Sequence, residues 1–201
     1  MRLLLTGFEP FLEYEVNPTM PIVEALNGTQ IGEYDIIGRI LPVSFKEAQQ
    51  AFVELIEDIE PDSIISLGVA VGRFHITPER VAINMRDSNE PDNDGNAPQG
   101  EAIRDGEAPS YFSTLPVQEI VDALKQAGYP AKVSNTAGTY VCNTIMYEGL
   151  HYAATHQIPS GFIHIPANFD LAIALGNVAG WHDGDLLATI QIAIETVLKT
   201  K

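Results

Sequence analysis

Short runs of apolar residues alternate along this chain with stretches in which apolar residues recur every three or four positions. This alternation is typical of α/β domains, in which helices connect the strands of a sheet and cover its faces. Most of the runs are apolar enough to be covered on both faces, so we expect them to pair in parallel. The predicted strands are residues 2–7, 34–43, 63–70, 80–85, 131–135 and 161–166.

Helical periodicity marks several of the segments between and after these strands. Asn17 and Pro18 suit the cap and the first position of a helix that stops at Gly28. No internal repeat or linker interrupts the 201 residues, so we expect residues 1–201 to form a single domain. The other predicted helices are residues 46–59, 117–127 and 185–198.

Residues 86–113 lack this alternation of apolar runs and helical periods. They show no sustained period and carry seven acidic residues and two arginines. Loops of this length are uncommon in compact domains, and they usually serve as lids, binding loops or subunit contacts. The alternative is a solvated excursion on the surface.

The charge of the chain limits the partners that it can bind. With 11 basic and 27 acidic residues, its formal net charge is -16, which repels phosphate backbones and anionic lipid headgroups. No apolar run reaches the ~18 residues of a membrane span, and the first run is too short for a secretory signal. We therefore expect a cytoplasmic protein that binds neither nucleic acid nor membranes.

Cys142 is the only cysteine of the chain, so it cannot form an internal disulfide, and no cysteine cluster offers a zinc site. A helix is predicted to begin near Val141. It would place the thiol in a first turn, where the helix dipole lowers a thiol pKa. The alternative is a small buried apolar residue, since unpaired cysteines are among the most buried residues. Only a nearby base would favour catalysis.

His164 is the best candidate for such a base, because it is a polar residue within the apolar run 161–166. A buried imidazole needs hydrogen-bond partners, which a thiol and a carboxylate would supply; a core histidine bonded to the backbone is the alternative. Glu79, at the start of the 80–85 run, is by itself an ordinary exposed loop residue. The other histidines, expected in surface, packing or capping positions, are His75, His151, His156 and His182.

These candidates lie within a larger pattern of motifs. Its stretches are LLTGFEPF (4–11), NPT (17–19), GR (72–73), ITPERVAIN (76–84), PDNDGN (91–96), YFSTLPV (111–117), SNTAGTYVCN (134–143) and GFIHIP (161–166). In this order and nearly this spacing they resemble pyroglutamyl peptidase I, a family of cysteine peptidases. The resemblance runs from residue 2 to about residue 166, and the motifs are highly specific.

The resemblance implies a catalytic triad of Cys142, His164 and Glu79. It implies an exopeptidase that removes an N-terminal pyroglutamyl residue from peptides, without a metal or another cofactor. The fold expected from it is a single α/β domain with a twisted, mostly parallel central sheet flanked by helices on both faces. A homotetramer is the expected assembly.

By the same resemblance, a substrate pocket for a flat, neutral lactam is lined by aromatic and apolar side chains. Ordinary core packing is the alternative role for the aromatic ones. The expected pocket residues are Phe8, Phe11, Asn17, Val69, Tyr140 and Val141.

The chain departs from the family pattern at several positions that bear on substrate recognition. Val69 stands where a glutamine that helps to recognise the lactam is usual, and Asn89 and Glu90 replace an arginine and an aliphatic residue. Tyr140 replaces the commoner phenylalanine, and the continuation after residue 166 differs.

Three functions therefore remain open from the sequence. The first is a pyroglutamyl peptidase. The second is a cysteine amidase with another small N-acyl or lactam substrate, which Val69 and Glu90 favour. The third is a catalytically quiet binding homologue, against which the intact triad argues.

Overall fold

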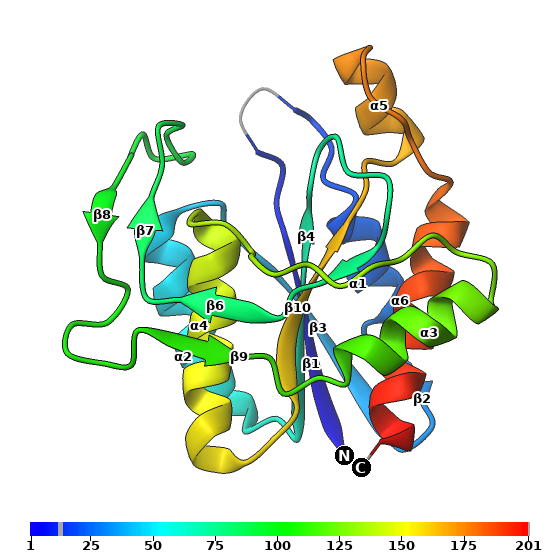
Figure 1. Cartoon of the computed structure of the whole chain (residues 1–201), viewed down its shortest axis with the longest axis horizontal. Coiled ribbons are helices and arrows are strands. Elements are labelled where there is room, and N and C mark those ends of the chain that lie inside the picture. Colours follow the sequence, from blue (N-terminus) through cyan, green and yellow to red (C-terminus); the bar gives the residue numbers. More distant parts are fainter. Residues whose placement is uncertain (12–13, 201) are drawn as a thin grey trace.

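A six-stranded sheet forms the centre of the molecule (Figure 1) in the computed structural model, which describes residues 1–11 and 14–200. The strand order is β2-β3-β1-β4-β10-β5, and the four inner strands pair in parallel. The edge strands β2 and β5 pair antiparallel with their neighbours. The strands are β1 (Arg2–Phe8), β2 (Gln30–Ile31), β3 (Tyr34–Leu41), β4 (Ser63–Val69), β5 (Thr77–Pro78) and β10 (Ser160–Ile165).

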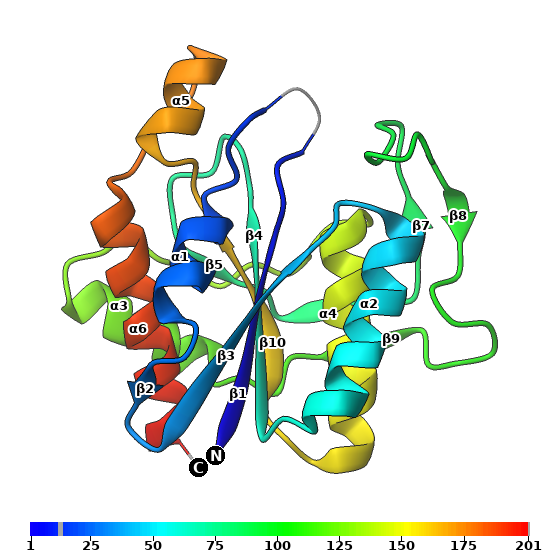
Figure 2. The same ribbon diagram turned by 180° about the vertical axis from the view of Figure 1, so that it is seen from behind.

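Helices cover both faces of this sheet (Figure 2). On one face, α2 (Phe45–Ile59) and α4 (Val141–His156) pack side by side over a core that includes Phe52, Tyr147 and Phe162. On the other, α1 (Thr19–Leu26), α3 (Val117–Gln126) and α6 (Asp183–Lys199) enclose a second core. The predicted three-layer α/β architecture is confirmed.

The positions of the helices follow their sequence signals closely. The predicted helices over 46–59, 117–127 and 185–198 correspond to α2, α3 and α6. The helix predicted at Pro18 begins one residue later, at Thr19, and the Asn17 Oδ1 still accepts a hydrogen bond from the Thr19 N–H. His182 caps α6, because its Nδ1 accepts from the Gly184 N–H at 3.1 Å.

One strand prediction was confirmed only in part, and another was wrong. Within residues 80–85 only β6 (Val81–Ile83) is a strand, and it pairs antiparallel with β9 (Ser110–Phe112) in a separate small sheet. Residues 131–135 form no strand; Ala131 and Ser134 make only isolated bridges, to Ile76 and Glu79. Both stretches are apolar enough for a strand, but residues 81–83 pair with β9 outside the central sheet. Residues 131–135 run beside the short β5, where the Ser134 N–H donates to the Pro78 carbonyl, but their contacts there remain isolated bridges.

The 86–113 segment, predicted as an aperiodic loop, leaves the domain as a ribbon. It contains β7 (Arg86–Asp87) and β8 (Gln99–Glu101), which pair antiparallel, and it returns through β9. The ribbon extends beyond α2 and α4 (Figure 1). This paired structure corrects the expectation of a loop without secondary structure.

The helix α5 (Phe169–Leu175) was not predicted. Its N-cap is Asn168, whose Oδ1 accepts from the Leu171 N–H, and Gly176 ends it with φ of 74°. With seven residues, two of them buried, it is too short to show a helical period. It stands beyond the carboxyl end of β10, at the edge of the sheet opposite the two termini (Figure 1). None of the helices in the described residues is long and apolar enough to cross a membrane.

Candidate active site

Cys142 lies in the first turn of α4, beside the carboxyl end of β4. The turn before it contains Gly138 with a φ of 82°, a conformation that a glycine adopts without strain. The Cys142 Sγ lies against β4, so closely that a Cβ at Gly68 would be only 3.0 Å from it. The helix start predicted near Val141 is confirmed, and Cys142 is a partly buried residue that packs against the edge of the core beneath α4.

His164 projects from β10 toward the same place. Strand residues two apart share a face, and Phe162 packs into the core beneath α4, so His164 lies on the α4 side of the sheet. Its partner in the parallel register is Gly68 of β4, the residue that the thiol contacts. His164 and Cys142 therefore both adjoin Gly68.

Glu79 is fixed beside His164 by the edge strand β5. Thr77 pairs with His164, and the Glu79 N–H donates to the Phe162 carbonyl at 2.9 Å. The Glu79 Oε1 then lies 2.7 Å from the His164 Nδ1. Glu79 is fully buried, which overturns its interpretation as an ordinary exposed loop residue.

Arg73 is a fourth member of this cluster, to which the sequence analysis gave no role. Its Nη1 donates to the Glu79 Oε1 at 2.7 Å and to the Thr77 hydroxyl oxygen at 2.8 Å. Its place in the GR–ITPER stretch was the available signal, but an arginine in a glycine-containing loop does not by itself reveal its partner.

The pKa of the Glu79 carboxyl is lowered from its usual value, which keeps the group ionised. Burial alone would raise this pKa, but hydrogen bonds and charge from His164, with further hydrogen bonds from Ser134 and Arg73, outweigh it. An ionised carboxylate can only accept hydrogen bonds, so the His164 Nδ1 is the donor. When His164 is neutral, its Nε2 is the nitrogen that can accept a proton.

The pKa of the Cys142 thiol is raised to about 12, mainly by burial and further by the negative charge of Glu79. A hydrogen bond from the backbone and the positive charge of Arg73 offset only part of this rise. The net direction is opposite to the one expected from a helix N-terminus, because desolvation here exceeds the effect of the dipole. The thiol therefore needs a base to give up its proton near neutral pH.

A cavity of about 100 Å³ opens beside the thiol. Its walls contain every pocket residue expected from the sequence together with Val43 and Cys142; the expected ones are Phe8, Phe11, Asn17, Val69, Tyr140 and Val141. Asn17 is the one amide side chain among them, and its Nδ2 donates to the Glu9 carbonyl. Asn89 and Glu90 are exposed and are not among the lining residues.

The outer wall of this cavity is held in place by the 86–113 ribbon. The Tyr140 ring packs edge-on against Phe11 and Phe45, and its hydroxyl donates to the Pro91 carbonyl at 3.0 Å. Buried Asp92 accepts hydrogen bonds from the N–H groups of Phe45 and Asn96. The turn between β7 and β8 thus supports the pocket wall through its contact with Tyr140.

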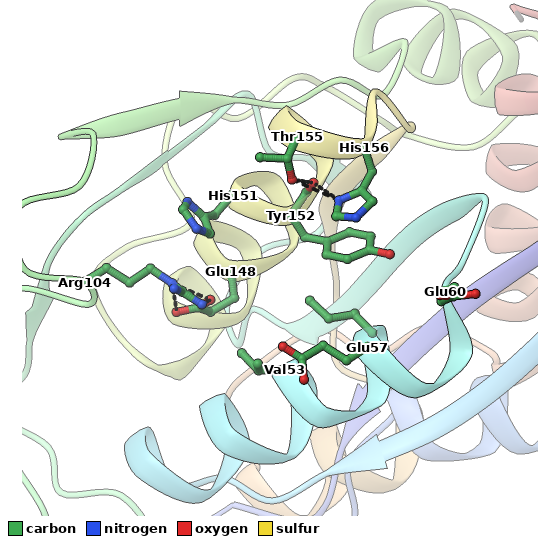
Figure 3. Close-up of a pocket in the computed structure, with 10 residues that line it drawn as sticks. Val53, Glu57, Glu60, Arg104, Glu148, His151, Tyr152, Thr155 and His156 are labelled. Carbon is green, nitrogen blue, oxygen red and sulfur yellow. Dashed lines mark hydrogen bonds and ion pairs between the residues drawn. The ribbon is translucent and has the colours of Figure 1, made fainter.

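A second, larger hollow lies between α2 and α4 (Figure 3), away from the cysteine. It contains His151 and His156 and is bordered by the ion pair of Arg104 with Glu148, 2.8 Å long. Neither histidine approaches the thiol, as their spacing along α4 predicted. Within residues 1–11 and 14–200, no group of three or more His, Cys, Asp or Glu residues is arranged to hold a metal ion.

The chain is similar to known proteins over nearly its whole length. The family described as "Pyroglutamyl peptidase" matches residues 1–200. A pyrrolidone-carboxylate peptidase of Lysinibacillus sphaericus is 54% identical over 199 residues, covering 98% of this chain and 97% of that protein. One of Halalkalibacterium halodurans is 46% identical over 196 residues, covering 96% and 97%.

A solved structure has the same fold as this chain. The pyrrolidone carboxyl peptidase of Pyrococcus furiosus superposes with a TM-score of 0.95 at 40% identity, covering 100% of this chain and 99% of its own. The match extends beyond residue 166 to the end of the sheet-covering helix α6. The chain belongs to the pyroglutamyl peptidase family of cysteine-type hydrolases.

Proposed function

We propose that Cys142, His164 and Glu79 act as a catalytic triad that removes an N-terminal pyroglutamyl residue from peptides. The observation that carries this proposal is the 2.7 Å contact of the buried Glu79 with His164, both beside the only thiol of the chain. A buried carboxylate, an imidazole and a thiol in this order are the parts of nucleophilic acyl transfer.

In the first half of the reaction, the His164 Nε2 takes the proton of Cys142, and the sulfur attacks the carbonyl of the pyroglutamyl residue. The imidazolium that forms is stabilised by the ionised Glu79, which also fixes the ring orientation. The C–N bond breaks as the imidazolium protonates the leaving amine, and a thioester remains on Cys142. The neutral imidazole then activates a water molecule, which hydrolyses the thioester and restores the thiol.

The start of α4 offers donors for the oxyanion. The N–H groups of Asn143 and Thr144 both donate to the Tyr140 carbonyl. The first N–H groups of a helix have no acceptor within it, so those of Val141 and Cys142 are the candidates that face the attacked carbonyl. Two N–H groups pointing at one developing charge are the usual form of such a site.

Specificity follows from the walls of the cavity. A pyroglutamyl ring is neutral, whereas an ordinary peptide N-terminus is an ammonium group, and burying it without a partner costs several kcal/mol. The cavity is lined mainly by aromatic and aliphatic side chains, which reject that charge.

Val69 favours the second candidate, a cysteine amidase that acts on another small N-acyl or lactam group. It lines the cavity with a side chain that cannot form a hydrogen bond, at the position where the family usually has a glutamine. The chemistry of the triad would be the same, and only the group that fills the cavity would differ.

We also infer a homotetramer located in the cytoplasm. The family resemblance supports the tetramer, and exposed apolar side chains such as Phe74 and Met85 are compatible with subunit contacts. The single thiol supports the cytoplasmic location, because a reducing compartment protects a catalytic thiol from oxidation. Light scattering of the purified protein tests the assembly.

The deciding experiment compares the hydrolysis of a pyroglutamyl anilide with that of its prolyl counterpart, each with and without a thiol alkylator. Fast cleavage of the pyroglutamyl compound alone, abolished by the alkylator, is the expected result. Cleavage that survives the alkylator would sink the proposal. No cleavage of either compound, with another N-acyl amide hydrolysed instead, would favour the amidase.

A further inference from the structure

Arg73 is the member of the active-site cluster to which the proposed reaction gives no role. It lies in the loop between β4 and β5, where its N–H donates to the Ala70 carbonyl at 3.0 Å and Gly72 turns the chain with a φ of 85°. The Arg73 side chain is 33% exposed, whereas the Glu79 side chain that it contacts is fully buried. Arg73 therefore extends from the surface to the buried end of the cluster.

The guanidinium group is connected to His164 through two residues. Its Nη1 donates to the Glu79 Oε1 at 2.7 Å, the same oxygen that lies 2.7 Å from the His164 Nδ1. It also donates to the Thr77 hydroxyl oxygen at 2.8 Å, and the Thr77 hydroxyl donates to the His164 carbonyl at 3.4 Å. Both residues that Arg73 holds are thus in direct contact with His164.

The contact with Arg73 matters most while His164 is neutral. Burial disfavours the ionised form of a carboxyl group, so a buried carboxylate without a charged partner tends to take up a proton. The groups that lower the pKa of the Glu79 carboxyl are His164, Ser134 and Arg73, and of these only Arg73 is permanently charged. The Cys142 thiol faces the same cluster from α4, where the charge of Glu79 raises its pKa and that of Arg73 lowers it.

A protonated Glu79 would disable the base. Its carboxyl group would then have an O–H to donate, the His164 Nδ1 would become the acceptor, and the ring proton would lie on Nε2. An Nε2 that already holds a proton cannot take another from the thiol of a neutral pair. A guanidinium group on the Glu79 oxygen opposes this state, because it favours the carboxylate that only accepts.

We propose that Arg73 is a positioning residue, which keeps Glu79 ionised while His164 is neutral and so keeps the His164 Nε2 free to take the thiol proton. This inference rests on the proposed triad. Arg73 is not among the residues that line the cavity beside Cys142, so its removal should lower kcat and leave KM close to that of the wild type.

The test follows two rates between about pH 4 and about pH 9 in the wild type and in Arg73→Met. One is the alkylation of Cys142 by iodoacetamide, and the other is kcat for a pyroglutamyl anilide. Without the positive charge, the pair of Glu79 and His164 binds a proton at higher pH, so the acidic limb of both profiles should move up by about one pH unit. The shift is at the lower end for an arginine beside a carboxylate, because the guanidinium group is partly exposed. On that limb, kcat should fall about tenfold.

Three further variants separate this role from a structural one. Arg73→Lys keeps the charge and should return the limb close to its wild-type position. Arg73→Gln lacks the charge but retains a donor, and it takes the place of Arg73→Met if circular dichroism shows that Arg73→Met does not fold. Arg80→Met is the matched control, because Arg80 directly follows Glu79 but is exposed, and its Nη1 donates to the Asn135 Oδ1 at 2.7 Å. Its profiles should match those of the wild type.

Profiles of Arg73→Met that coincide with those of the wild type would overturn the inference, even if the variant were less stable in urea. An equal shift in Arg80→Met would also overturn it, because the net charge of the chain would then be the cause. A limb that Arg73→Lys does not restore would do the same. If the wild type does not cleave the anilide, the proposed function fails, but the alkylation profiles still decide the role of Arg73, because alkylation needs the thiol and its base and no substrate.

Discussion

A methyl group at Gly68 would lie 2.8 Å from the Phe162 ring and 3.0 Å from the Cys142 Sγ. The first distance is shorter than ordinary van der Waals contact, so Gly68→Ala must displace the ring, the thiol or β4 itself. We expect a loss of stability of about 1–3 kcal/mol, as for other overpacked cores, and a larger relative loss of kcat.

Unfolding in urea and the hydrolysis of a pyroglutamyl anilide measure the two effects. Gly149→Ala is the control, because Gly149 also packs closely, against Ser160 and Phe52, but lies two turns along α4 from the thiol. Its kcat should stay close to that of the wild type. An unchanged kcat in Gly68→Ala would show that the contact with the thiol is unimportant.

The raised pKa of Cys142 gives a second prediction at this scale. Burial already raises the pKa of Cys142 to about 12 in the protein, so if His164 is the base that takes the thiol proton, its removal leaves no neighbouring group to take that proton near neutral pH. The thiolate is the species that an alkylator modifies, and below the pKa its fraction rises tenfold for each pH unit. In His164→Ala, alkylation of Cys142 at pH 7 should therefore be much slower than in the wild type and should keep rising beyond pH 9.

Glu79→Gln should reduce kcat less than the substitution of either of the other two triad residues. The glutamine keeps the shape of the side chain but lacks the charge, so it no longer favours the imidazolium and leaves Arg73 without its carboxylate. We expect kcat to fall about 10²-fold or more, compared with complete loss of turnover in Cys142→Ala and a loss near 10⁴-fold in His164→Ala. Steady-state kinetics of the three variants, each folded by circular dichroism, check this order, which a fully active Cys142→Ala would contradict.

The candidate site residues could be predicted from the sequence because they lie in short, ordered motifs. Their surroundings could not. Arg73 and Gly68 act through partners on β5, α4 and β10, and contacts of this kind depend on how the strands pair rather than on local spacing. The direction of the Cys142 pKa was missed for the same reason, since burial depends on the whole fold.

At the scale of elements, the ribbon is attached to the body of the domain through α4. Glu148, on α4, is fully buried and accepts hydrogen bonds from the guanidinium group of Arg104 and from the Gln49 Nε2 of α2. The Asn84 Oδ1 holds the same stretch by accepting from the N–H groups of Ile103 and Arg104.

Glu148→Ala should therefore loosen the ribbon. Removing one partner of a buried ion pair costs about 3–5 kcal/mol, and less where one side chain is partly exposed, as Arg104 is. We expect a loss near 2–3 kcal/mol and faster proteolytic cleavage within residues 86–113 than in the wild type. Glu119→Ala, an exposed acidic change on α3, is the control. Unchanged cleavage rates would mean that the ribbon does not depend on this contact.

Helices and strands could be predicted where the apolar pattern of the segment itself identifies them. The helices α2, α3 and α6 have long apolar faces and clear ends, and the inner strands are strongly apolar. The strand over 80–85 was confirmed only in part, and the one over 131–135 was wrong, because apolar content gives no information on which sheet a segment joins. The ribbon strands pair through distant partners, which no local pattern reveals.

At the scale of the whole molecule, charge acts on stability in two opposite ways as the pH falls from 7. The formal net charge of -16 makes the folded chain repel itself, and protonation of exposed carboxylates relieves this repulsion. Two buried carboxylates, Glu79 and Asp92, act in the other direction. Burial alone would raise the pKa of each, but hydrogen bonds, and for Glu79 the charge of His164, lower both below their usual values of 4.5 and 3.8.

A carboxyl group with a lowered pKa in the folded state contributes stability that is complete above its usual pKa and is lost as the pH falls through the lowered value. The urea midpoint should therefore stay level or rise slightly from pH 7 to about pH 5, as self-repulsion decreases, and then fall steeply below pH 4.

In Asp92→Asn, the midpoint should be lower than in the wild type at pH 7, because the amide replaces a charged acceptor of several hydrogen bonds with a neutral one. The difference between the two proteins should shrink once the pH falls below 3.8, the usual pKa of this carboxyl, because the unfolded chain then binds a proton that the folded Asp92 resists. A difference that stays constant over this range would place the contribution of Asp92 in packing rather than in its charge.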